Sequence, residues 1–152
     1  MSYKLRPAIL SDLQVLLSFE QGIIATERPF DPTLKQGEIH YYDIGELIMS
    51  DQAEVLVVEY NGEVIGSGYA KILPAKDYLD HTQYSYLGFM YVKETHRSKG
   101  VNKMILDGLI AWSDSKGIKE IKLQVYDDNE PAMKAYIKSG FKKHLVEMRL
   151  VR

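Results

Sequence analysis

The sequence contains no cysteine among its 152 residues. This absence excludes disulfides, thiolate zinc sites and a cysteine nucleophile, and it fits a reducing compartment. Long hydrophobic stretches are also missing. No run approaches the roughly 18 apolar residues of a transmembrane helix, and the N-terminal "MSYKLRPAIL" lacks the apolar core of a signal peptide. We therefore expect a cytoplasmic protein that does not interact with membranes.

An excess of charge of one sign is missing too. The chain has 19 Lys and Arg against 21 Asp and Glu, which gives a net charge of -2. This balance gives no general attraction to nucleic acid, so any anion site must come from a local cluster. The four histidines lack ligand spacing with one another, so we expect no metal. With 45% hydrophobic and 26% charged residues, the chain fits one globular domain over residues 1–152.

Hydrophobic periodicity predicts the order of strands and helices. Asn61-Gly62 between two apolar runs is a strong hairpin signal, and Pro7 suits an edge strand. Ser11 followed by Gln14 resembles a capping box at a helix start. Hairpins come first and two strand-helix-strand units follow, which favours a mixed sheet. The expected strands are 3–9, 53–60, 63–73, 82–92, 118–126 and 141–151, and the expected helices are 11–24, 42–50, 100–116 and 129–139.

A basic glycine turn, "HRSKGVN" at residues 96–102, joins an apolar strand to a helix. A helix N-terminus presents unpaired N–H groups that attract anions, and Gly100 lets the backbone approach an anion closely. Arg97, Lys99 and Lys103 add positive charge. The turn has neither the P-loop pattern nor the three glycines of a dinucleotide fingerprint. These residues alone leave two interpretations open: a phosphate cradle, or a plain turn with solvated cations.

A second pattern follows about thirty residues later in "NEPAMKAYIKSGF", residues 129–141. Ala132 and Tyr136 are four residues apart and share one helical face, and Gly140 suits a helix end. By itself, Tyr136 also fits a half-buried core tyrosine.

Together the two patterns resemble the acyl-CoA site of the GCN5-related N-acetyltransferase superfamily. "RSKGVN" resembles its [Q/R]-x-x-G-x-[G/A] phosphate loop, and Asn129 to Phe141 resembles the second half of the site. The order of elements matches along essentially the whole chain. The resemblance implies an α/β (α+β) single domain with a mixed, mostly antiparallel sheet of six to seven strands. The sheet would be splayed into a V and flanked by about four helices.

The resemblance also implies where acetyl-CoA binds. It would lie in the V between the strands that end near Val92 and near Tyr126, with a bulge near Gly88. Asn129 would lie beside the cofactor arm, and Tyr136 would protonate the departing thiolate. The pyrophosphate would be held by the backbone N–H groups of Arg97, Ser98, Lys99, Gly100, Val101 and Asn102. The backbone groups of Met90, Tyr91 and Val92 would pair with the pantetheine arm, and one of their N–H groups would polarise the thioester.

Two departures from the family pattern are visible. Asn102 replaces the final small residue of the loop, where it could crowd the pyrophosphate or donate another hydrogen bond. No acidic residue lies in "YLGFMYV", residues 86–92, where several family members carry a glutamate base. A neutral amine would need no base. Otherwise the candidates are Glu27, His81, Tyr84, Tyr86 and Glu94.

The acceptor side is expected at two loops, residues 26–42 and 76–86, which are rich in acids and aromatics. Such residues suit a cationic amine, although a solvated loop would have a similar composition. We take Glu27, Phe30 and Tyr84 as candidate acceptor-binding residues. The expected partner is a small-molecule or peptide amine, and a homodimer is possible through the last strand.

The leading hypothesis is therefore an acetyl-CoA-dependent N-acetyltransferase in which a primary amine attacks the thioester directly. The alternative is a non-catalytic CoA-binding regulatory or scaffold domain, which Asn102 and the missing strand carboxylate permit. A third possibility is a domain that binds another phosphate ligand, and stabilisation by CoA would exclude it.

Overall fold

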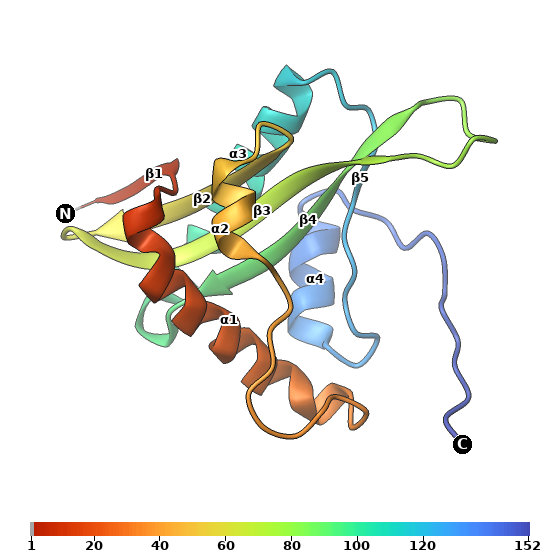
Figure 1. Cartoon of the computed structure of the whole chain (residues 1–152), viewed down its shortest axis with the longest axis horizontal. Coiled ribbons are helices and arrows are strands. Elements are labelled where there is room, and N and C mark those ends of the chain that lie inside the picture. The colour runs from red at the N-terminus through yellow and green to blue at the C-terminus, as the bar shows by residue number, and fades with distance from the viewer. Residues whose placement is uncertain (1) are drawn as a thin grey trace.

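The computed structural model describes residues 2–152, and in this part of the chain five strands form one mixed sheet in the order β1-β2-β3-β4-β5 (Figure 1). Neighbouring strands are antiparallel except β4 and β5, which are parallel. The mixed sheet was predicted correctly, but the expected six to seven strands were too many. The strands are β1 (Tyr3–Pro7), β2 (Ala53–Tyr60), β3 (Glu63–Pro74), β4 (Gln83–Val92) and β5 (Ile121–Lys122). The helices are α1 (Leu13–Glu27), α2 (Ile44–Met49), α3 (Val101–Ser115) and α4 (Glu130–Lys138), with 3-10 turns at Leu10–Asp12, Arg28–Phe30 and Glu94–His96.

Helices cover both faces of the sheet (Figure 1). Successive side chains of a strand point to opposite faces, so Val57 of β2 packs with α1 and α2, whereas Val58 packs with α3. This explains why β2 is apolar at nearly every position, as a strand buried on both faces should be. Phe19 and Ile44 anchor the first layer, and Ile105 anchors the second.

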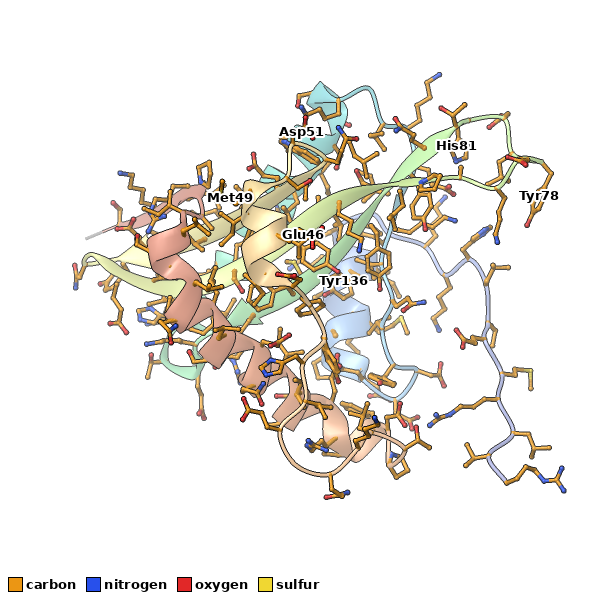
Figure 2. The ribbon with its side chains drawn as sticks, in the orientation of Figure 1. Glu46, Met49, Asp51, Tyr78, His81 and Tyr136 are labelled. Carbon is orange, nitrogen blue, oxygen red and sulfur yellow. The ribbon has the colours of Figure 1, made fainter. Side chains whose placement is uncertain are left out.

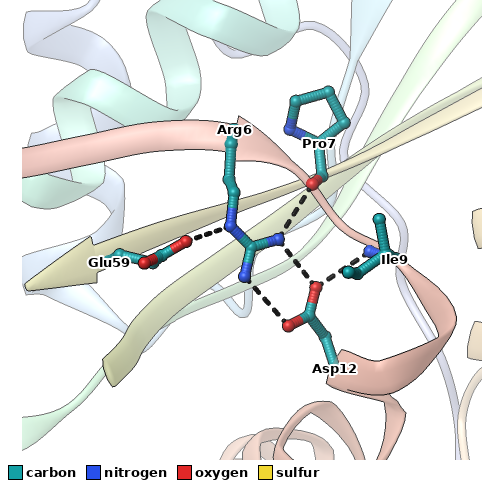
Figure 3. Close-up of polar contacts among 5 residues, drawn as sticks. All are labelled: Arg6, Pro7, Ile9, Asp12 and Glu59. Carbon is teal, nitrogen blue, oxygen red and sulfur yellow. Dashed lines mark hydrogen bonds and ion pairs between the residues drawn. The ribbon is translucent and has the colours of Figure 1, made fainter. Parts of the chain in front are cut away.

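The edge strand β1 is tied to the start of α1 by an arginine network (Figure 3). Arg6 donates two hydrogen bonds to the carboxylate of Asp12, at 2.9 and 3.0 Å, and also pairs with Glu59 of β2. Asp12 accepts the backbone N–H of Ile9 as well, at 2.8 Å. The capping box predicted at Ser11 is therefore not formed. The carboxylate of Asp12, one residue later, accepts the backbone N–H of Ile9 and binds Arg6 instead.

A β-bulge interrupts the pairing of β3 with β4. Ser67 pairs with Tyr91 and Tyr69 pairs with Gly88, so two residues of β4 lie opposite Gly68. The sequence placed the bulge near Gly88, and the residue that adopts the left-handed conformation is its neighbour Phe89, at φ +60°. A Cβ atom on Gly68 would come within 2.7 Å of both Ile105 Cγ2 and Met90 Sδ, so a larger residue here would force the packed α3 layer to shift. A bulge of this kind bends its strand and increases the local twist.

The parallel pairing of β4 with β5 is short. It joins Ser85 to Ile121 and Tyr86 to Lys122, after which the two chain segments separate. The strand expected at 118–126 therefore forms only over two residues. The bend at Phe89 offers a physical reason, since a bent strand cannot keep a straight neighbour within hydrogen-bonding distance.

The strand expected at 141–151 is wrong. Residues 142–152, which we call the C-terminal arm, form neither helix nor strand and run away from the sheet past α4 (Figure 1). Leu145, Val146, Met148 and Leu150 are between 81% and 88% exposed. Alternating apolar residues favour a strand only where a neighbouring strand accepts their backbone hydrogen bonds, and the described residues offer the arm no such partner.

Candidate active site

The N-terminus of α3 forms an open backbone cradle. Ser98 and Gly100 both adopt left-handed conformations, at φ +62° and +83°, and turn the chain from β4 into the helix. The bond from Met104 N–H to Gly100 O, at 3.1 Å, is the first of the helical ladder, so the N–H groups just before it are free to bind a ligand. A Cβ atom built on Gly100 would meet nothing within 4 Å. The turn therefore fits a phosphate group.

Two of the three cations expected to attract the phosphate already have partners. Arg97 folds back so that its Nε donates to the carbonyl of Val92, at 2.9 Å, and its guanidinium lies 5.9 Å from the ring centre of Tyr91. Lys103 pairs with Asp107 one turn along α3, at 2.6 Å. The backbone N–H groups and the exposed Lys99 must supply most of the attraction for an anion.

The end of β4 has a free edge on the side away from β3. Tyr91 and Val92 pair with β3, and past Tyr86 the opposite edge has no strand partner among residues 2–152. Tyr91 stacks on Phe19 of α1 with ring centres 4.6 Å apart, which fixes the strand on that face. A free strand edge can bind an extended chain through its backbone groups.

The second half of the expected site lies on α4. Asn129 caps this helix, because its side-chain oxygen accepts the N–H of Ala132 at 3.4 Å. Its side-chain NH₂ group is not needed for the cap. Gly140 ends the helix at φ +101°, as the sequence predicted.

Tyr136 lies where α4 passes β4, near the point at which β4 and β5 separate (Figure 2). Its ring packs partly buried against the α3 layer and meets Phe141 edge-on at 6.1 Å. Burial raises the pKa of Tyr136 to about 12, with smaller effects from Glu27 and Tyr86. The phenol therefore keeps its proton at neutral pH and can donate a hydrogen bond.

Two acids and two tyrosines interact in a group that we call the acid–tyrosine cluster: Glu27, Asp31, Tyr41 and Tyr126. Tyr126 donates a hydrogen bond to Asp31 at 3.2 Å, and Phe30 stacks on the Tyr126 ring at 5.8 Å. Burial raises the pKa of Glu27, with a smaller contribution from the charge of Asp31. The pKa of Tyr41 is raised by burial first and by the nearby Glu27 second. The cluster is therefore a negative and partly dry surface.

Buried Glu20 fixes the loop that carries part of this cluster. Its carboxylate accepts the backbone N–H groups of Tyr41 and Tyr42, at 2.8 and 2.9 Å, and also contacts Nδ1 of His40 at 2.7 Å. Because Glu20 is fully buried, these bonds compensate the cost of removing its charge from water. Sequence reasoning missed this role, since an acid within an amphipathic helix is normally exposed.

The structure brings only some of the expected acceptor residues together. Glu27 and Phe30 lie at the acid–tyrosine cluster. Tyr84 lies at the start of β4, where the ammonium group of Lys122 is 4.4 Å from its ring centre, and lines a different hollow of about 400 Å³. His81, a candidate base, is held between Asp80 and Glu120 at the tip of the β3–β4 hairpin. Sequence reasoning did not identify Tyr126, because 95 positions separate it from its partner Asp31.

Residues 2–152 contain no group of three His, Cys, Asp or Glu side chains arranged to bind a metal ion. In the same part of the chain, no helix is both long and apolar enough to span a bilayer.

Comparisons with known proteins identify the family of this chain. A sequence model of the acetyltransferase (GNAT) family matches residues 21–141, so the chain belongs to this family. No curated protein sequence matches significantly.

Solved structures share the fold at low sequence identity. A tetramutant of the BH1408 protein from Bacillus halodurans is 18% identical, with a TM-score of 0.86 over 98% of this chain and 99% of that one. A predicted acetyltransferase with acetyl-CoA from Clostridium acetobutylicum is 20% identical, with a TM-score of 0.72 over 99% and 96%. Glucosamine-6-phosphate N-acetyltransferase from Arabidopsis thaliana is 17% identical, with a TM-score of 0.72 over 99% of each chain.

Proposed function

We propose that this protein transfers an acetyl group from acetyl-CoA to a primary amine of a small molecule or peptide. One observation carries the proposal. The open cradle at the start of α3 follows the free end of β4, and the protonated Tyr136 on α4 would face the same region, past the point where β4 and β5 separate. A solved relative of the same fold contains acetyl-CoA, which supports this choice of donor.

The cradle would bind the pyrophosphate. Backbone N–H groups from Ser98 to Asn102 would point to it at the start of α3, where the helix dipole also favours negative charge. The N–H of Arg97 already donates to the carbonyl of Glu94, at 3.3 Å. Asn102, which replaces the usual small residue, would add a side-chain amide donor to this set. The free edge of β4 at Met90 to Val92 would hold the pantetheine arm by backbone pairing, and Asn129 would contribute its unused NH₂ group.

At the other end of the donor, a backbone N–H group of β4 would hydrogen-bond the thioester oxygen. This group stabilises the negative charge that develops there as the amine attacks the carbonyl carbon. A C–N bond forms, the C–S bond breaks, and the amine loses one proton. The sulfur leaves with the electron pair of the C–S bond.

Tyr136 would donate a hydrogen bond, and finally its proton, to the departing sulfur. An ordinary thiol has a pKa of about 8.5, which is below the value of about 12 for Tyr136. Complete transfer therefore requires that the same dry surroundings also raise the pKa of the thiol. The hydrogen bond alone already stabilises the thiolate in the transition state.

Glu27 and Tyr86 are the candidate bases whose charges affect Tyr136, and of the two Glu27 is the carboxylate. It is near enough for its charge to raise the pKa of Tyr136, and its own pKa is raised by burial. A carboxylate with a raised pKa accepts a proton more readily, which suits removal of the amine proton.

The proposal is tested by incubating the protein with acetyl-CoA and a mixture of polyamines, amino acids, aminoglycosides and peptides, followed by mass spectrometry. We expect an acetylated amine that appears only with protein present. Thermal stabilisation by CoA without any acetylated product would favour the non-catalytic CoA-binding alternative. No stabilisation by CoA would contradict both.

A further inference from the structure

The C-terminal arm is attached to the acceptor side of the site through one side chain. Arg149 donates a hydrogen bond to Asp31 and another to the hydroxyl of Thr33, both at 3.0 Å. Its neighbours in the arm are largely exposed. A guanidinium from the far end of the chain therefore occupies a site on the loop that follows α1.

The Asp31 site is organised to hold a positive charge. The carboxylate accepts the N–H and the hydroxyl of Thr33, at 3.0 and 2.5 Å, and the hydroxyl of Tyr126 at 3.2 Å. These bonds fix its orientation, and the Thr33 bonds are the main reason that the pKa of Asp31 falls to about 2. The side chain of Asp31 is 13% exposed, whereas that of Arg149 is 51% exposed. The carboxylate of Asp31 is therefore oriented and ionised, and the guanidinium that occupies the site is accessible to solvent.

The site is continuous with the region where the acetyl group would be transferred. Burial is the largest cause of the raised pKa values of Glu27, Tyr41 and Tyr126, and the charge of Asp31 adds to each. The charge of Glu27 likewise adds to the effect of burial on the pKa of Tyr136. A negative potential therefore extends from the Asp31 site through Glu27 to Tyr136. A molecule with two positive ends could place one at Asp31 and its reacting amine near Tyr136.

We propose that Asp31, flanked by Tyr126 and Thr33, binds a second positive charge on the amine acceptor, and that Arg149 fills this site until the acceptor displaces it. The inference rests on the proposed acetyltransferase function and narrows its substrate class to amines that carry a second ammonium or guanidinium group. Arg149 acts as a tethered competitor whose effective concentration is set by the arm. Because Arg149 is half exposed, the need to displace it should weaken acceptor binding by only about two- to fivefold.

The test measures binding rather than turnover, with agmatine as the probe because it carries both an amine and a guanidinium. Calorimetry is done on the full chain saturated with CoA, for the wild type, Arg149→Ala, Arg152→Ala and Asp31→Asn. Arg152 is the matched control, since it is an exposed arginine of the same arm for which no ion pair is found among residues 2–152.

Arg149→Ala should bind agmatine about two- to fivefold more tightly than wild type, and Arg152→Ala should match wild type. Asp31→Asn should bind agmatine several-fold more weakly than wild type. The affinity for n-butylamine, which carries a single charge, should be the same for the wild type and Arg149→Ala. Equal agmatine affinities for Arg149→Ala and Arg152→Ala would overturn the inference. Because Arg149 lies in the exposed arm, its replacement does not endanger folding.

The two proposals fail separately. If agmatine binding changes as expected but no amine is acetylated, the cation site stands and the proposed function fails. If single-charge amines are acetylated but agmatine affinity does not respond to Arg149, the proposed function stands and the cation site is wrong.

Discussion

The hydroxyl of Ser67 on β3 donates a hydrogen bond to the carbonyl of Phe89 on β4, at 3.1 Å, in the interior of the protein. Ser67 is 0% and Phe89 is 2% exposed. The β-bulge removes this carbonyl from the regular ladder, and Ser67 supplies the donor that the ladder would have given. The bond therefore supports the bend that separates the end of β4 from β5.

Replacing Ser67 with alanine should lower the free energy of unfolding by about 1–3 kcal/mol, because a buried carbonyl loses its partner. The affinity for CoA should fall as well, since the free edge of β4 would lose its fixed shape. Urea denaturation and calorimetry measure the two effects.

Ser85, on β4, is a matched control. Its hydroxyl is also buried but has no hydrogen-bond partner among the described residues. Ser85→Ala should therefore be neutral or slightly stabilising. Equal destabilisation by the two replacements would show that the Ser67 bond has no particular role.

Alanine replacements of Gly100 and Gly117, at the two ends of α3, distinguish an effect on stability from an effect on ligand binding. Both have left-handed conformations, at φ +83° and +74°, and both face open space. Alanine at either position should cost about 1 kcal/mol, because L-residues disfavour this conformation. Only Gly100→Ala should weaken CoA binding, by roughly tenfold or 1.4 kcal/mol. Equal CoA affinities for the two variants would argue against a phosphate site at the start of α3.

His40 should make stability depend on pH near neutrality. Its hydrogen bond to the buried Glu20 is the largest cause of its raised pKa. The pKa of His40 in the folded protein lies above the unfolded value of about 6.5. Protonated His40 therefore contributes fully to the free energy of unfolding below about pH 6.5, and this contribution is lost as the pH rises through the folded pKa. The free energy of unfolding should therefore fall as the pH rises above about 6.5, and less steeply in His40→Gln.

His81 controls for histidines in general, since its pKa is also raised, chiefly by Asp80 and then by Glu120. His81→Gln should keep the part of the pH dependence of the free energy of unfolding that comes from the contact between His40 and Glu20. If His40→Gln showed the same pH profile as wild type, the Glu20 contact would not hold the loop before α2.

Local signals in the sequence predicted the elements that depend on neighbouring residues. Asn61-Gly62 defined the β2–β3 hairpin, and the glycines at 100, 117 and 140 marked the ends of α3 and α4 within one or two residues. Each of these signals acts through backbone conformation over a few positions, and the distant chain does not alter it.

Features that depend on contacts distant in sequence could not be predicted in the same way. The alternation in residues 141–151 resembles a strand, but whether a strand forms depends on a partner edge that the pattern does not encode. Arg97 differs for a local reason: its charge predicted a phosphate contact, but its side chain folds back onto the carbonyl of Val92, five residues earlier. The Tyr126–Asp31 and Arg149–Asp31 contacts join residues 95 and 118 positions apart, so no spacing rule reveals them.

The central claim is that Tyr136 assists departure of the thiolate in acetyl transfer from acetyl-CoA. The most direct test compares Tyr136→Phe with Tyr126→Phe, which removes a phenol from the acid–tyrosine cluster without touching α4. We predict that Tyr136→Phe lowers kcat about 100-fold while CoA affinity stays the same, and that Tyr126→Phe mainly raises the acceptor KM. Turnover by Tyr136→Phe at the wild-type rate, with CoA still bound, would contradict the claim.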